Sequence, residues 1–164
     1  LAENVYMNLI HSAKHSLYIM TPYLIITDEM THALGLAARR GVDVRIITPG
    51  IPDKKTVYSV TRSYYGELAR QGVRIFEWTP GFCHAKQCLC DSDLASIGTS
   101  NLDYRSLYLH FECGVFLYMT ECIKRIKEDA LETFAISKEI SLEECENKNF
   151  FYQLFFILPF ITYR

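Results

Sequence analysis

Neither sign of charge dominates this sequence of 164 residues, because 17 lysine and arginine residues are matched by 19 aspartate and glutamate residues. A protein that coats nucleic acid is usually more basic, so this balance disfavours that class, although a nuclease with a local basic cleft is compatible with it. Disordered and low-complexity classes are excluded, since 49% of the residues are hydrophobic and 22% are charged. The length fits one compact domain or a large piece of a bigger protein.

The chain has no Cys-x-x-Cys pair and no recognisable signal peptide, although it has six cysteines. They are Cys83, Cys88, Cys90, Cys113, Cys122 and Cys145. We therefore expect reduced thiols in a cytosolic chain. A metal site formed by Cys83, Cys88 and Cys90 with His84 is the alternative, but that spacing matches no zinc motif.

No initiator methionine opens the sequence, which starts Leu1-Ala2-Glu3, and we expect a fragment of a longer protein. Nor does any apolar run reach the roughly 20 residues that a membrane-spanning helix needs. Residues 150–161 are almost wholly apolar and aromatic. Two interpretations stay open for them: packing on the core or on a missing domain, or an interfacial position on a membrane, with Lys148 and Arg164 near lipid headgroups.

Alternating helical and strand patterns predict an α/β fold. Helices are expected over about 3–14, 28–40 and 57–71, with Asp28 as an N-cap, and strands over 16–21, 42–47 and 73–78. The stretches Ala38-Arg39-Arg40-Gly41-Val42 and Ala69-Arg70-Gln71-Gly72-Val73 each join a helix end, a glycine turn and a strand start. Runs at 85–90, 94–98 and 109–119 predict further strands, antiparallel in part, before a helix over 120–137.

One polar motif interrupts these patterns. The stretch His84-Ala85-Lys86-Gln87-Cys88-Leu89-Cys90-Asp91 has the form H-x-K-x4-D, and Gly98-Thr99-Ser100-Asn101 follows it. Positions i and i+2 of a strand share a face, so His84 and Lys86 should project into one site. Lys86 is a fixed cation suited to the charge that grows on a phosphodiester in its transition state. Thr99 and Asn101 can add neutral hydrogen bonds to the same oxygens.

The histidine of this motif would do the chemistry. Imidazole is the side-chain group whose ordinary pKa lies nearest neutral pH, so His84 could attack phosphorus or pass a proton to an alkoxide. Glu112, expected on a later strand, is the candidate to hold its second ring nitrogen. Asp91 has the wrong parity for the face of His84, so we expect it to fix backbone N–H groups near a turn. The alternative is a satisfied polar network with no chemistry.

The assembled pattern resembles the phospholipase D superfamily, whose motif is H-x-K-x4-D-x6-G-[ST]-x-N; every fixed position is matched here. The resemblance implies an α-β-α sandwich with a mixed parallel and antiparallel central sheet. It implies a catalytic domain over residues 1–137, followed by a helical, apolar tail over 138–164. It also implies no cofactor and no metal, and a site completed by a second copy of the motif, either elsewhere in one polypeptide or in a homodimer.

The wider sequence resembles the C-terminal half of the bacterial cardiolipin synthases in this superfamily. The resemblance rests on runs such as Tyr18-Ile19-Met20-Thr21-Pro22-Tyr23 and Pro80-Gly81-Phe82-Cys83-His84, with departures at His110 and Gly114. It implies a phosphatidyltransferase that joins two phosphatidylglycerols at the cytoplasmic face of the cell membrane. Its partners would be that lipid, the membrane surface and a missing N-terminal half with the first motif; no nucleic acid is expected. The alternatives are a lipid hydrolase, a homodimeric nuclease and an inactive binding module.

Overall fold

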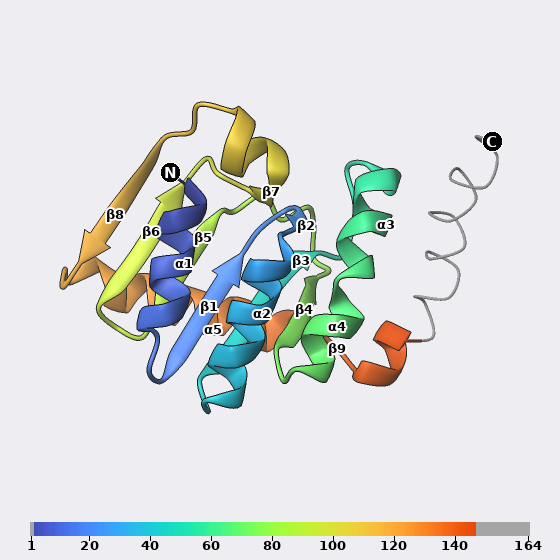
Figure 1. Ribbon diagram of the computed structural model, residues 1–164, viewed down its shortest axis with the longest axis horizontal. Helices are drawn as coiled ribbons and strands as arrows, with labels where there is room; N and C mark the ends of the chain where they lie inside the picture. Colours follow the sequence, from blue (N-terminus) through green and yellow to red (C-terminus); the bar gives the residue numbers. More distant parts are fainter. Residues whose placement is uncertain (1, 147–164) are drawn as a thin grey trace.

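A mixed seven-stranded sheet forms the middle layer of the computed structural model, which describes residues 2–146 (Figure 1). The strands are β1 (Ser16–Met20), β3 (Asp43–Pro49), β4 (Arg74–Trp78), β5 (Gln87–Cys90), β6 (Leu94–Gly98), β8 (Gly114–Tyr118) and β9 (Lys138–Ile140). Their order is β8-β6-β5-β1-β3-β4-β9. The pairs β1–β3 and β3–β4 are parallel, and every other pair in this sheet is antiparallel. The predicted mixed sheet is confirmed.

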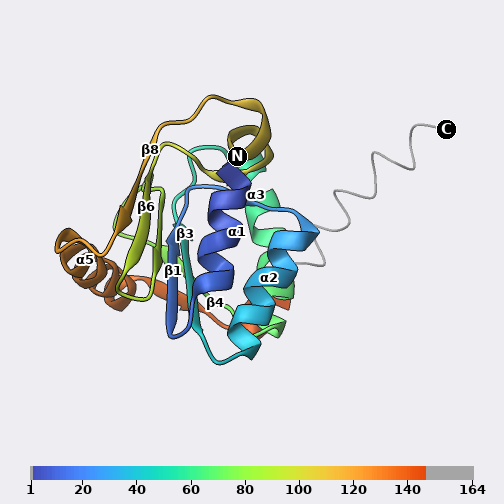
Figure 2. The same ribbon diagram turned by 60° about the vertical axis from the view of Figure 1, so that its left-hand side comes forward.

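Helices cover both faces of the sheet (Figure 2). They are α1 (Ala2–Ser12), α2 (Asp28–Arg39), α3 (Lys55–Ser63), α4 (Tyr65–Arg70) and α5 (Cys122–Ile136). Leu9 of α1, Leu34 of α2 and Leu68 of α4 belong to one buried cluster, whereas Ile123 and Phe134 of α5 belong to a second cluster. Figure 2 shows α1 and α2 on one side of the sheet and α5 on the other. The predicted α-β-α sandwich is therefore confirmed.

The glycine turns predicted from the two similar stretches are present. Gly41 and Gly72 follow α2 and α4 with φ values of 91° and 94°, a left-handed conformation that glycine adopts without steric cost. The N-cap of α2 is Thr27 rather than Asp28: the Thr27 hydroxyl accepts a hydrogen bond from the Met30 N–H at 3.2 Å. Asp28 therefore lies inside the first turn of the helix, where an acidic side chain favours the helix dipole.

Several predicted element bounds are wrong. The helix expected over 57–71 is broken at Tyr64 into α3 and α4. The run at 85–90 enters the sheet only at Gln87, because β1 ends at Met20 and Met20 is the partner of Gln87. The run at 109–119 becomes a strand only at Gly114, after a π-helical turn over Arg105–Leu109. A short parallel pair, β2 (Leu24–Ile25) with β7 (Leu102–Asp103), has no counterpart in the sequence prediction.

The first residues after the predicted domain boundary at 137/138 continue the central sheet. Residues 138–140 form β9, which pairs antiparallel with β4 at one edge of the sheet. Ile140 and Cys145 are buried in the same core as α1 and α2. The apolar run at 150–161 lies outside the described residues. Within residues 2–146, no helix is long and apolar enough to cross a membrane.

A buried ion pair links α3 to β4. The Arg62 guanidinium bonds the Glu77 carboxylate, and the Tyr58 hydroxyl donates a hydrogen bond to the same carboxylate at 3.2 Å. Both charged side chains are buried. A buried charge that loses its partner is costly because neither water nor an opposite charge then compensates it.

We predict that Arg62→Met lowers the free energy of unfolding by about 3–5 kcal/mol, because Glu77 is left buried without its cation. Urea unfolding of the 164-residue chain measures this. Arg70→Met is the control, since Arg70 and Glu146 form an exposed pair with an N–O distance of 3.1 Å and such pairs contribute about 1 kcal/mol or less. Equal losses in the two variants would contradict the prediction.

Candidate active site

The predicted site residues other than Asp91 gather at one end of the sheet, and Asp91 lies at the opposite end. β1 ends at Met20, and its antiparallel partner β5 begins there, so the segment that carries His84 and Lys86 lies just beyond this end. β6 runs back to the same end, and Thr99 and Asn101 follow it directly. Pairing of β5 with β1 and β6 thus places both halves of the motif side by side.

The histidine and lysine of the motif lie in an extended segment that precedes β5, not in the strand itself. The His84 side chain is exposed, and its ring stacks on Phe82 with 5.5 Å between ring centroids. The Lys86 ammonium donates a hydrogen bond to the backbone carbonyl of His84 at 2.7 Å. Burial lowers the pKa of Lys86, while Cys83, Glu112 and Asp103 act in the opposite direction. The partly buried cation is therefore joined to the residue that carries the exposed imidazole, through the backbone carbonyl of that residue.

Glu112 lies in the loop before β8 rather than on a strand, because Arg105–Leu109 turns as a π-helix. Its carboxylate accepts a hydrogen bond from the Thr99 hydroxyl, and one oxygen lies 3.8 Å from Nδ1 of His110. The hydrogen bond from Thr99 lowers the pKa of Glu112, and His110 and Lys86 lower it further. No hydrogen bond or ion pair joins Glu112 to His84 within residues 2–146, so the structure does not bring these two predicted partners together.

The two predicted phosphate-binding residues are both tethered. Besides its bond to Glu112, the Thr99 hydroxyl accepts a hydrogen bond from the Cys113 N–H at 2.9 Å. The Asn101 side-chain amide donates to Asp103 at 3.2 Å. Asp103 also accepts the Ser106 N–H at 2.8 Å and so fixes the start of the π-helical turn. These contacts hold the Thr99 hydroxyl beside Glu112 and the Asn101 amide beside Asp103.

Two residues of this cluster were not assigned a role from the sequence. Asp103 had a visible signal, because an acidic residue two positions after the motif asparagine can reach back to its amide. His110 appeared only as a departure from the family pattern, and its spacing of two from Glu112 was the available sign of contact. A loop offers no fixed side-chain periodicity, so spacing alone could not establish that contact.

The predicted backbone role of Asp91 is confirmed by three hydrogen bonds. Its carboxylate accepts the N–H groups of Lys14, His15 and Ser16 at 3.0, 2.8 and 2.8 Å. Asp91 itself has φ of 56°, a left-handed conformation in which aspartate and asparagine are enriched. Partial burial raises the pKa of the Asp91 carboxyl, but the three N–H donors lower it by more, so the net shift is downward.

The cysteines do not converge with His84. Cys88 and Cys90 are buried in the core beneath α1, whereas His84 is exposed. All six cysteines are free thiols. Within the described range of 2–146, no group of three or more histidine, cysteine or acidic side chains is arranged to hold a metal ion.

Comparison with solved structures defines the class of the fold. The chain is similar to the phospholipase D family member Nuc from Salmonella typhimurium, with a TM-score of 0.72 over 85% of this chain and 91% of that one, at 20% identity. The mixed sheet between helical layers is therefore the fold of that phospholipase D family member.

Sequence comparison identifies the family. The family described as "Cardiolipin synthase, PLD-like domain" matches residues 6–133, and the chain belongs to it. A Streptococcus mutans protein described as uncharacterized is 52% identical over 139 residues, covering 85% of this chain and 30% of that protein. Cardiolipin synthase 2 of Bacillus anthracis is 45% identical over 141 residues, covering 86% of this chain and 27% of that protein. The chain thus spans less than a third of the length of these relatives.

We predict that Asp91→Asn lowers the free energy of unfolding by about 1 kcal/mol at pH 7, because a neutral amide is a weaker acceptor for the backbone N–H groups. The folded-state pKa of Asp91 is depressed, so its contribution is present above the unfolded-state pKa of about 3.9 and is lost as the pH falls through the folded-state value. The difference in the free energy of unfolding between Asp91→Asn and the unsubstituted chain should therefore disappear in acid.

Urea unfolding of both chains between pH 7 and pH 2.5 measures that difference. Asp93→Asn is the control, since the Asp93 side chain is exposed. A difference that stays constant down to the lowest pH would show that the ionised Asp91 carboxylate is not the source of the stabilisation.

Proposed function

We propose that this chain is the C-terminal catalytic half of a cardiolipin synthase. The reaction would transfer a phosphatidyl group from one phosphatidylglycerol to a hydroxyl of a second, with release of glycerol. The substrate would be a lipid in the cytoplasmic leaflet of the membrane, and the partner would be another part of the same longer polypeptide that carries a second H-x-K-x4-D motif.

The proposed chemistry has two steps that balance. In the first, a histidine ring nitrogen bonds to phosphorus, the P–O bond to glycerol breaks, and the second histidine protonates the leaving alkoxide. In the next, that second histidine removes the proton from the incoming hydroxyl, the new P–O bond forms, and the P–N bond of the phosphohistidine breaks. By its position in the second motif, we assign His84 the acid and base role; this assignment rests on analogy with two-motif relatives.

One observation carries the proposal: the His84 ring is exposed at the sheet end where Lys86, Thr99 and Asn101 also lie, and the Lys86 ammonium bonds the backbone carbonyl of His84. An exposed ring can reach a lipid phosphate, which a sealed polar network could not. Exposure therefore favours a reactive role over the purely structural alternative.

The neighbouring groups suit a phosphodiester. Lys86 supplies positive charge for the phosphate oxygens, and the partial burial that lowers its pKa also strengthens its field, because less water screens it. The Asn101 amide has a second N–H that its bond to Asp103 does not use. Fixed donors aimed at developing charge need no reorganisation during the reaction.

In this proposal Glu112 is a positioning residue. It orients the Thr99 hydroxyl, and its depressed pKa keeps it an acceptor at neutral pH. Its negative charge also partly balances Lys86, so the site favours one phosphate rather than a more highly charged anion. The role expected from the sequence, a hydrogen bond to His84, would require the carboxylate to leave Thr99 once substrate is bound.

We predict that the 164-residue chain alone has little or no turnover of phosphatidylglycerol in mixed micelles, because it supplies one of the two required histidines. Thin-layer chromatography of a labelled lipid would measure cardiolipin and phosphatidic acid together. Rapid turnover by the isolated chain in the presence of EDTA would overturn the two-motif scheme. Cleavage of DNA with steep salt dependence would instead assign a nuclease.

We predict that His84→Asn in the full-length protein reduces cardiolipin formation by at least about 1,000-fold, the scale seen when a catalytic histidine is removed. Asparagine keeps a polar side chain but has no group that exchanges a proton near pH 7. His32→Asn is the matched control, because His32 is an exposed histidine on α2. Retained activity in a folded His84→Asn protein would remove His84 from the mechanism.

A further inference from the structure

The two edges of the sheet differ in how they are protected. β9, at one edge, is only three residues long and carries Lys138 and Glu139. β8, at the other edge, has the sequence Gly114-Val115-Phe116-Leu117-Tyr118 and no charged residue (Figure 1). Short, charged edge strands resist pairing with other chains, whereas a longer apolar edge invites it. Of these two edge strands, only β9 therefore has the features of an edge that remains exposed to solvent.

β8 is apolar on both of its faces. Register with β6 places Val115 and Leu117 on the side of α5, and Phe116 and Tyr118 on the side of α1. Phe116 is 54% exposed and Tyr118 is 61% exposed. Apolar residues at consecutive positions are typical of a strand that is covered on both faces. β8 thus has the sequence of a covered strand at a position where residues 2–146 leave it open.

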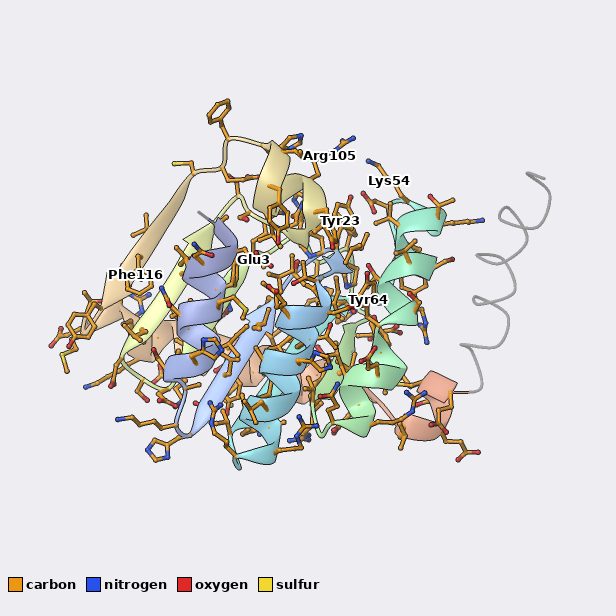
Figure 3. All side chains as sticks on the ribbon, viewed as in Figure 1. Glu3, Tyr23, Lys54, Tyr64, Arg105 and Phe116 are labelled. Atoms are coloured by element: carbon orange, nitrogen blue, oxygen red, sulfur yellow. The ribbon has the colours of Figure 1, made fainter. Side chains whose placement is uncertain are left out.

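An apolar groove of about 530 Å³ runs beside this strand on the α1 side of the sheet. Its lining includes Val5 of α1, Phe116 of β8 and the fully exposed Phe111. Ser96 and Gly98 of β6 line it as well. Figure 3 shows Phe116 on β8, at the margin of the molecule away from α3.

The width of the uncovered area matches one helix. Within the described chain, the buried core on the α1 side has no member from β8. Adjacent strands lie about 4.8 Å apart, so β6 and β8 together present about 10 Å of sheet. A helix with its side chains is about 10 Å across, and packed helices lie about 8–10 Å apart. One helix beside α1 would therefore cover both strands.

We propose that this groove is the docking surface for an apolar helix from another part of the full-length polypeptide. The relatives supply the reason for that occupant, since this chain spans only 27% to 30% of their length and most of the polypeptide lies elsewhere. Ser100, Ser106 and Glu112 also line the groove, and Glu112 accepts the hydrogen bond from Thr99. The docked segment would thus bring the rest of the protein beside the candidate site. This inference rests on the proposed function, which requires a second motif there.

A cysteine at Phe116 reports on the docking without reference to activity. We expect Phe116→Cys to react readily with a maleimide in the 164-residue chain, and at least about tenfold more slowly in the full-length protein, because thiol reactivity follows exposure. The native Cys122, exposed at the start of α5, is the internal control and should react at similar rates in both proteins. Mass spectrometry assigns each modified site.

Two outcomes would overturn the inference. Equal labelling of Phe116→Cys in both proteins would mean that the groove stays open. Protection already present in the 164-residue chain, together with a dimer in sedimentation, would assign the groove to a second copy. Phe111→Cys, at the exposed phenylalanine that lines the same groove, repeats the test if Phe116→Cys does not fold.

Labelling of Phe116→Cys in a full-length protein that also carries His84→Asn separates this inference from the proposed function. Protection there together with lost cardiolipin formation supports both. Protection of the cysteine with cardiolipin formation retained would contradict only the proposed role of His84. Labelling as fast as in the 164-residue chain, with cardiolipin formation lost, would contradict only the docking surface.

Discussion

Pairing of β5 with β1 is the constraint on which the candidate site depends. The register Met20–Gln87 sets where the sheet ends and therefore where Lys86 begins to project beyond it. Side chains alternate along a strand, so a slip of one residue would move the buried Cys88 and Cys90 to the α5 side of the sheet and turn Lys86 away. At the other end of this strand pair, the Asp91 carboxylate fixes the start of β1 by accepting hydrogen bonds from the N–H groups just before and at its first residue. The motif aspartate thus acts on the site through the backbone register.

The same end of the sheet is shaped by linked polar contacts. Thr21 at the end of β1 accepts the Leu102 N–H at 3.1 Å, which ties the segment after Asn101 to the central strand. Asp103 and Glu112 then fix the side chains of Asn101 and Thr99. Each residue is held by a neighbour that lies far away in the sequence or across a turn. Such a chain of contacts fixes the Thr99 hydroxyl and the Asn101 amide, because each is held by at least one hydrogen bond.

The two edges of the sheet differ in how well they are covered within residues 2–146. The β4–β9 side is closed by charged residues, by the buried Arg62–Glu77 pair and by the Phe76–Phe134 ring contact, with 4.9 Å between centroids. The β8 side keeps aromatic side chains in contact with solvent. A site that needs a second histidine would lie close to the β8 side, where another part of the polypeptide can approach. The asymmetry of the sheet and the single copy of the motif in this sequence are both compatible with the proposed two-motif architecture.

The sequence by itself determined the α/β class, the glycine turns at Gly41 and Gly72, and the identity of the motif residues. Those features depend on local periodicity, on the steric freedom of glycine and on fixed spacing, all of which are properties of short stretches. It also determined that Asp91 would bind backbone N–H groups, because the alternation of side chains along a strand is a local property. Only the tertiary structure decided that Glu112 contacts Thr99 and His110, that residues 138–140 complete the sheet, and that β8 is an edge. Those outcomes depend on loop paths and strand order, which residues distant in the sequence set together.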